Sequence, residues 1–287
     1  MSKGYICVVQ NTKDTNYLRL AYALALSIKN TQSNVNKLSI VTDIKRMPKG
    51  YRKAFDKVIP LKHDRAKDEE WKLHNIVDLY DYTPYDETVM LDSDMLFLSD
   101  VSHWWDFLSL KNIWFTTQVR NLYNDTVPFG TIYREEFIKN SLPSVYNAFF
   151  YFKKSTEAKE LFDMMKHVCT NWDFCVSRYL FNKKPKVFST DVAFGLSLKL
   201  LGLGVEGTFD QMPFPYFTHM KIQNQGWSRL NRYEDGDWQK AVDVSIDSFD
   251  NSLGVIINTI RQFGVFHYHV KHFLSDKMIE ILEQANE

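Results

Sequence analysis

Residues 89–98, VMLDSDMLFL, constrain the fold more than any other stretch of the chain. Apolar runs bounded by polar residues are typical of a strand that is buried on both faces at the centre of a parallel sheet. Asp92 and Asp94 interrupt the runs, and an ionised carboxylate is too costly to bury without a partner. We therefore expect the pair at the open end of a buried strand, where a positive group meets it.

The spacing of the two aspartates favours a metal site. Alternation along a strand places Asp92 and Asp94 on one face and turns Ser93 away, so both carboxylates can converge on one hard cation. That cation could hold a diphosphate. The alternative is a capped strand end whose carboxylates bind helix amides. A second Asp-x-Asp, Asp235-Gly236-Asp237, lies among turn-forming residues, and we interpret it as a solvated turn.

Composition limits the class of protein. A chain of 287 residues can form one large α/β domain or two small ones, and we favour one domain with an irregular C-terminal extension. The 35 basic and 35 acidic side chains give a net charge of zero, so a wide phosphate-binding face is not required. The 21 Phe, 15 Tyr and 7 Trp suit a dense core and a ring-lined cleft.

The cysteines and the N-terminal sequence bear on location. Cys7, Cys169 and Cys175 form no C-x-x-C pair and no even set, which favours reduced, buried thiols in a cytoplasm-like compartment. The N-terminus enters an apolar strand without a signal peptide, and no run reaches membrane-spanning length. The sequence therefore predicts a cytoplasmic protein without a membrane span, and it indicates no particular oligomeric state.

Hydrophobic spacing predicts alternating strands and helices. The chain opens with a strand over 5–9, a polar loop over 10–16 and a helix over 17–28, an order that places a ligand-binding loop at the carboxyl edge of a sheet. It contains no G-x-G-x-x-G and no P-loop. We expect further strands over 37–42, 57–61, 113–119, 145–152 and 264–269, and regular structure of unspecified type over 255–260. We expect further helices over 51–55, 71–80, 156–172, 191–201 and 274–284.

The predicted helix over 71–80 and the polar segment over 120–141 carry more specific predictions. The helix over 71–80 should turn four side chains inward, those of Leu73, Ile76, Val77 and Tyr80. The polar segment over 120–141 is too long for an ordinary connection, so we expect a functional loop with short helices there.

The order of these elements resembles the GT-A glycosyltransferases, and most of all glycosyltransferase family 8, the glycogenin and galactosyltransferase group. The similarity lies in four stretches, VVQNTKDTNYLRLAYALALSI, WKLHNIVDLYDYTPYDETVMLDSDMLFLSDVSHWWDFL, VYNAFFYFKKS and FGVFHYHVKHF. The second is the most specific, because a lysine on a helix, a strand, D-x-D and an aromatic turn form a long ordered pattern. HWWDFL and GVFHYH also resemble members of the group that large tailed phages carry.

This resemblance implies a GT-A fold, in which helices flank a Rossmann-like, mostly parallel mixed sheet. Residues 1–118 would form the donor-binding half and residues 119–287 the acceptor half of a single domain. It also implies a UDP-sugar donor, a divalent metal and retention of the anomeric configuration. Asp92, Asp94 and His267 match the metal ligands, a set that suits Mn²⁺ better than Mg²⁺. His269 would share a strand face with His267.

The resemblance also implies a donor site. Gln10, Asn11 and Thr12 begin the loop that would receive the base and ribose, and the ring of Tyr17 would stack there. Ser93, between the two aspartates, belongs to the same site.

Two lysines are further candidates for the donor site. Lys72 matches a family lysine that could pair with Asp92 or with the donor's sugar, and an exposed helix lysine is the alternative. Lys271 lies near a family lysine that grips the diphosphate, although its spacing from His267 departs from H-F-x-G-x-x-K.

Two residues match the family's catalytic positions. Asn147 corresponds to the asparagine of N-[SA]-G, although Ala148-Phe149 follows it here. Asp191 corresponds to the aspartate of a D-Q pair, with Val192 in place of the glutamine, so a nucleophilic role is weakened. Asp191 would bind sugar hydroxyls and stabilise an oxocarbenium-like centre, and its alternative role is a favourable carboxylate near a helix N-terminus.

The acceptor and two other functions stay open. The phage-like resemblance suggests a hydroxymethylated base of DNA as acceptor, with a surface glycan or a small molecule as rival. A local basic groove would come from Lys183, Lys184 and Lys186 or from Arg229 and Arg232. A nucleotidyltransferase that makes the sugar nucleotide also uses paired aspartates, but residues 10–16 lack the glycines it needs. The third function is a sugar-binding or metal-binding module without catalysis.

Overall fold

The computed structural model describes residues 1–67, 69, 72–126, 135–203, 216–220, 242–247, 252–257, 259–268 and 270–287. Several residues discussed above lie outside this part of the chain, namely Trp71, Arg229, Arg232, Asp235, Gly236, Asp237 and His269.

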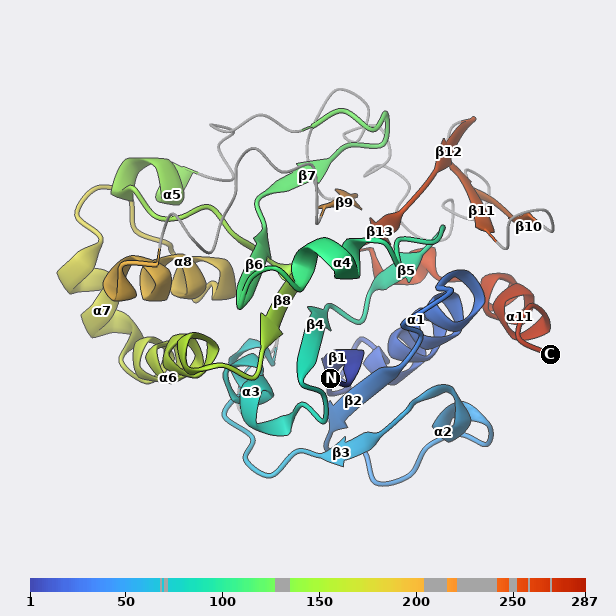
Figure 1. The fold of residues 1–287 in the computed structure, drawn as a ribbon, viewed down its shortest axis with the longest axis horizontal. Helices are drawn as coiled ribbons and strands as arrows, with labels where there is room; N and C mark the ends of the chain where they lie inside the picture. The colour runs from blue at the N-terminus through green and yellow to red at the C-terminus, as the bar shows by residue number, and fades with distance from the viewer. Residues whose placement is uncertain are drawn as a thin grey trace.

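A six-stranded sheet runs through the centre of the molecule (Figure 1). Its strand order is β3 (Val58–Pro60), β2 (Leu38–Thr42), β1 (Lys3–Val9), β4 (Glu87–Leu91), β8 (Tyr146–Lys153) and β6 (Ile113–Thr116). The first four strands are parallel, and β8 runs antiparallel to both of its neighbours. The mostly parallel mixed sheet expected from the sequence is therefore observed.

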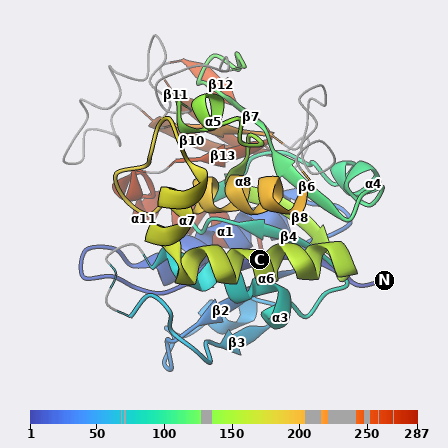
Figure 2. The same cartoon turned by 90° about the vertical axis from the view of Figure 1, so that its left-hand side faces the viewer.

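Both faces of this sheet are covered, because its central strands are apolar on both sides. On β1, Tyr5, Cys7 and Val9 belong to one core cluster, whereas Ile6 between them belongs to the other. The first cluster includes side chains of α1 (Tyr17–Thr31), α4 (Trp104–Leu108) and α11 (Asp276–Gln284). The second includes side chains of α6 (Thr156–Thr170), α7 (Trp172–Tyr179) and α8 (Thr190–Leu201). Figure 2 shows α6 and α8 lying across this second face.

Local capping explains where several helices begin. At the starts of α1, α6, α8 and α11, a side-chain oxygen of the residue before the helix accepts a hydrogen bond from a backbone N–H of the first turn. These capping residues are, in the same order, Asn16, Ser155, Ser189 and Ser275. Shorter helices complete the α structure, namely α2 (Tyr51–Ala54), α3 (Leu79–Tyr82), α5 (Glu135–Asn140) and the 3₁₀ turns η1 (Leu73–Asp78) and η3 (Lys271–Phe273).

Two smaller sheets lie beside the central one. The first has four strands in the order β5 (Met95–Phe97), β13 (Val265–His267), β9 (Tyr216–His219) and β7 (Gln118–Arg120). The second has three antiparallel strands, β10 (Val242–Asp247), β11 (Ser252–Ile257) and β12 (Ile260–Gln262). α7, β9 and β10 were not predicted. The sequences of α7 and β9 show no clear period over so few residues, whereas β10 alternates apolar and polar residues and this signal was missed.

Two predicted strands are wrong in their continuity. The stretch 89–98 is not one strand, because β4 ends at Leu91 in the central sheet and β5 starts at Met95 in the four-stranded sheet. The expected strand over 113–119 is likewise divided into β6 and β7, which belong to different sheets. In both places the chain crosses between sheets, and a continuous apolar run does not reveal such a crossing.

The predicted helix over 71–80 is also corrected. In its place η1 precedes the short α3, and Leu73 is 39% exposed while Ile76 and Val77 are buried. Tyr80 is half-buried against the second cluster. Tighter 3₁₀ winding changes the angle between successive side chains, so the 3.6-residue period does not predict the inward face.

The three cysteines are buried and free, as expected. Among the described helices, none combines the length and apolar character needed to cross a lipid bilayer.

Candidate functional site

Asp92, Ser93 and Asp94 occupy the crossing between the central sheet and the four-stranded sheet. The N–H of Asp92 donates to the carbonyl of Ala148 on β8 at 2.9 Å, so the central sheet holds one end of the crossing. The carbonyl of Asp94 accepts from the N–H of Tyr268 at 3.1 Å, and the next residue, Met95, pairs with His267. The crossing is therefore fixed by backbone hydrogen bonds to strands that lie far away in the sequence.

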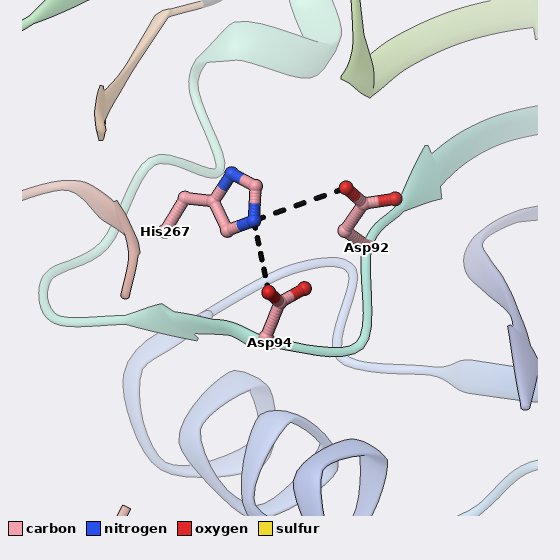
Figure 3. Close-up of side chains that lie close together, drawn as sticks. All are labelled: Asp92, Asp94 and His267. Atoms are coloured by element: carbon pink, nitrogen blue, oxygen red, sulfur yellow. Dashed lines mark ion pairs between the residues drawn. The ribbon is translucent and has the colours of Figure 1, made fainter. Parts of the chain in front are cut away.

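This arrangement brings three metal-binding side chains together (Figure 3). The Nε2 atom of His267 lies 3.1 Å from Asp94 Oδ2 and 3.8 Å from Asp92 Oδ2. One ligand atom from each residue lies within 4.8 Å of the others, so a single cation can contact all three. Two carboxylates and an imidazole are a donor set that fits Mn²⁺ or Mg²⁺.

Exposure differs sharply between the two carboxylates. The side chain of Asp94 is 6% exposed, whereas that of Asp92 is 39% exposed. Burial raises the pKa of Asp92, and the negative charge of Asp94 adds to the effect. Burial also opposes ionisation of Asp94, but the charges of His267 and Lys271 outweigh it and hold the Asp94 pKa well below its usual range. Asp94 is therefore the firmly ionised, enclosed member of the pair.

Lys271 supplies the positive group expected beside the aspartates. It begins η3, and its ammonium donates to Asp94 Oδ2. Its Nζ also lies 5.5 Å from the centroid of the Tyr17 ring. Burial alone would lower the pKa of Lys271, but the charge of Asp94 and the hydrogen bond to it raise the pKa.

A cavity of about 200 Å³ opens over this group. Nine of the residues selected from the sequence line it, namely Gln10, Tyr17, Lys72, Asp92, Ser93, Asp94, Asn147, His267 and Lys271. Ser93 lines the cavity with both aspartates, so the predicted alternation is wrong: the chain turns here instead of continuing as a strand. Asn11 and Thr12 line a second cavity of about 350 Å³, which shares Tyr17 and Lys72 with the first.

The polar loop after β1 is held by hydrogen bonds of its own side chains. Asn11 Oδ1 accepts from the N–H of Leu18 at 3.1 Å, and Thr12 Oγ1 accepts from the N–H of Thr15 at 3.2 Å. Gln10 is buried, and its Nε2 donates to Asp43 and Asp64 at 3.0 Å each. These side chains hold the loop in place, which leaves backbone groups and the Tyr17 ring for a ligand.

Lys72 adopts a left-handed conformation with φ of 53°. Its ammonium donates to the carbonyls of Ala66 and Lys67, at 2.6 Å each, rather than to Asp92. Lys72 was expected to pair with Asp92 or with the donor's sugar. The structure shows no hydrogen bond or ion pair between Lys72 and Asp92. Lys72 lines both cavities.

Asp191 and Asn147 contact each other. The backbone N–H of Asn147 donates to Asp191 Oδ1 at 2.7 Å, which joins β8 to the first turn of α8. Asn147 faces the cavity of Asp92, whereas Asp191 lines a third cavity, of about 310 Å³, beside α5. The negative charge of Asp191 also contributes to the raised pKa of Asp92, so the two sites are electrostatically connected.

Sequence reasoning missed His219. Its ring stacks on that of His267 with centroids 4.7 Å apart and an angle of 28° between the planes. The N–H of Met220 donates to the carbonyl of His267 at 3.1 Å, and β9 pairs with β13 in parallel. His219 lies in a stretch without visible periodicity, so only the strand pairing shows that it supports His267.

Comparison with solved structures assigns the fold. A galactosyltransferase LgtC, solved with donor and acceptor sugar analogs, is 13% identical, with a TM-score of 0.52 over 98% of this chain and 95% of that chain. An active-site mutant of LgtC gives 12% identity and a TM-score of 0.51, covering 99% and 95%. Mouse xyloside xylosyltransferase 1 is 12% identical, covers 92% and 97%, and has a TM-score of 0.47. No protein-family model and no curated protein sequence matches the chain. The chain therefore has the GT-A glycosyltransferase fold predicted from its sequence.

Proposed function

We propose that this protein is a metal-dependent glycosyltransferase that moves a sugar from a UDP-sugar to a hydroxyl acceptor. The observation that carries the proposal is the convergence of Asp92, Asp94 and His267 within 4.8 Å in the wall of a cavity. The four sequence stretches that resemble family 8 support retention of configuration. We also infer one catalytic domain, with residues 1–118 for the donor and residues 119–287 for the acceptor.

The two neighbouring cavities suit the two ends of a nucleotide sugar. The cavity lined by Asn11, Thr12 and Tyr17 would take the base and ribose. The diphosphate would then lie over Asp92 and Asp94, and the sugar would extend toward Asn147. Tyr17 lines both cavities, as a residue at the junction of nucleoside and diphosphate should.

The proposed chemistry requires a good leaving group and a tolerated positive charge on the sugar. A bound divalent cation would neutralise the charge that develops on the departing diphosphate. The carboxylate of Asp191, held by the N–H of Asn147, would stabilise the positive charge on the anomeric carbon. The charges of His267 and Lys271 hold the pKa of the enclosed Asp94 well below its usual range, so this carboxylate is suited to hold a cation.

Donor breakdown tests this function. Incubation with a panel of UDP-sugars and Mn²⁺ should release UDP, and chelation with EDTA should stop the release. The same protein given UTP and a sugar 1-phosphate should release no pyrophosphate. Pyrophosphate release would show a nucleotidyltransferase instead, and UDP-sugar binding without breakdown would show a binding module.

For the acceptor we propose a hydroxymethylated base of DNA, following the similarity to the phage-carried group. The third cavity, beside Asp191, is lined by Lys183 and Lys186. The connection between α7 and α8 is held by Asn140, whose Nδ2 donates to the carbonyl of Lys183 at 2.6 Å. The same connection leaves Phe181 and Val187 exposed by 77% and 76%. Lysines flanked by exposed apolar side chains suit phosphates and bases.

Salt dependence of DNA binding tests the acceptor. Each lost phosphate contact should make the negative slope of log K against log salt shallower by about 0.9, so Lys184→Gln with Lys186→Gln should reduce its magnitude by about two. The exposed pair Lys53→Gln with Lys57→Gln is the control and should leave the slope unchanged. No binding at low salt, or retention that does not depend on salt, would exclude DNA and favour a glycan or small-molecule acceptor.

A further inference from the structure

Lys271 contacts a carboxylate oxygen of the candidate metal site. Its ammonium donates to Asp94 Oδ2, and that atom is also the one that lies 3.1 Å from His267 Nε2. The carboxylate of Asp94 is 6% exposed, and the Lys271 side chain is 26% exposed. The ammonium of Lys271 therefore already pairs with the oxygen at the centre of the candidate metal site, and the His267 ring partly encloses it.

Because Asp94 is buried, its contact with Lys271 stabilises the folded protein even without a ligand. An ionised carboxylate that is almost fully enclosed is strongly destabilising unless it is paired. Lys271 supplies that pairing across 177 positions of sequence. A divalent cation that binds Asp94 through Oδ2 competes with the ammonium for that atom. Through either oxygen, a cation and an ammonium on one carboxylate repel each other across a short distance.

The surroundings of Lys271 give its ammonium another place to go. Lys271 lines the same cavity as both aspartates, and its Nζ lies 5.5 Å from the Tyr17 ring centroid. Tyr17 borders the second cavity as well. A diphosphate that spans the two cavities would pass this point and offer the lysine new anionic partners.

We propose that Lys271 is an exchangeable counter-ion that makes the Asp92, Asp94 and His267 site select a metal–diphosphate complex over the free divalent cation. This inference rests on the proposed function. Without a diphosphate, metal binding displaces the ammonium from Asp94 and gives it no new partner. With a diphosphate, the displaced ammonium pairs with phosphate oxygens, so the displacement is compensated.

The exchange couples the two ligands. Metal and nucleotide must strengthen each other's binding by the same factor, because coupling free energies are reciprocal. In the wild type we expect UDP to tighten Mn²⁺ binding by about tenfold or more, within the usual range of such coupling. Lys271→Met should bind Mn²⁺ alone about tenfold more tightly than the wild type, the factor that a charge-assisted hydrogen bond is worth. The same variant should bind UDP in the presence of Mn²⁺ more weakly.

Binding measurements without turnover test this proposal. Mn²⁺ affinity is measured by electron paramagnetic resonance of the free ion and by calorimetry, with and without saturating UDP. Lys271→Arg keeps the charge and should keep weak binding of Mn²⁺ alone. Lys72→Met is the matched control: Lys72 lines the same cavity, but its ammonium binds two carbonyls instead of Asp94. This control removes the same charge and should change the affinity for Mn²⁺ alone by less than about twofold.

The outcomes separate this inference from the proposed function. Tighter binding of Mn²⁺ alone in Lys271→Met, but not in Lys72→Met, supports the exchange. Equal affinity in the wild type with and without UDP overturns it, even if Lys271→Met does not fold. An equal gain in Lys72→Met also overturns it, because the effect would then be general electrostatics. Absence of Mn²⁺ binding in every protein, with UDP present, would instead refute the metal site and with it the proposed function.

Discussion

Replacing Asp94 with asparagine is expected to abolish metal-dependent nucleotide binding and to lower donor turnover by about a hundredfold to a thousandfold, the usual loss when a group that stabilises transition-state charge is removed. Asparagine keeps the size of the side chain but removes its charge. It takes away the enclosed ligand and also leaves the ammonium of Lys271 without its carboxylate partner. Cation binding should therefore weaken even though Asp92 and His267 remain.

A thermal melt measures the binding part of this prediction. A ligand present at a hundred times its dissociation constant adds about 2.7 kcal/mol to the stability of the folded state. The wild type should gain this stabilisation from UDP only when Mn²⁺ is present, and Asp94→Asn should gain none. Asp106→Asn, at an exposed position on α4, is the control and should behave as the wild type. Unchanged turnover in Asp94→Asn would show that the Asp-x-Asp is structural.

Replacing Phe150 with alanine is expected to lower the free energy of unfolding by about 3–5 kcal/mol, the usual cost of removing a buried aromatic ring. Phe150 on β8 is fully buried. Its ring centroid lies 5.0 Å from that of Phe115 and 5.0 Å from that of Phe194 on α8. Rings of β6, β8 and α8 surround the site, so the neighbours can collapse into the cavity only in part.

Urea denaturation measures this loss, since the midpoint falls with stability when the slope is unchanged. The matched control is Phe174→Ala, which removes the same ring from a position that is 62% exposed. The control should change the free energy of unfolding by less than about 0.5 kcal/mol. A similar loss in both variants would contradict the assignment of Phe150 to the centre of the second core cluster.

Much of the fold could be predicted from local sequence. The apolar run over 5–9 and the helical period over 156–172 are properties of neighbouring residues, and the structure forms β1 and α6 there. The boundaries of α1 and α8 lie within a few residues of those predicted. The buried strand before Asp92 was also predicted correctly, together with a positive partner for the carboxylates. The roles of the individual site residues stay predictions.

Failures of prediction concentrate where the chain changes sheets. Residues 89–98 contain two strands of different sheets. At the turn between these strands, Asp92, Ser93 and Asp94 all line one cavity. An apolar run has the same composition whether it forms one continuous strand or two strands of different sheets. The stacking of His219 on His267 likewise depends on parallel pairing of β9 with β13. Its residues carry no pattern that indicates this pairing.

The sequence by itself determined which side chains this protein can use: the two aspartates after a buried strand, a histidine on a late strand and a polar loop after the first strand. Tertiary structure alone decided that His267 and Lys271 both contact the same oxygen of Asp94. The physical reason is the distance along the chain over which each interaction acts. Periodicity and capping act between residues a few positions apart, whereas the site is assembled by backbone pairing between strands that are distant along the chain.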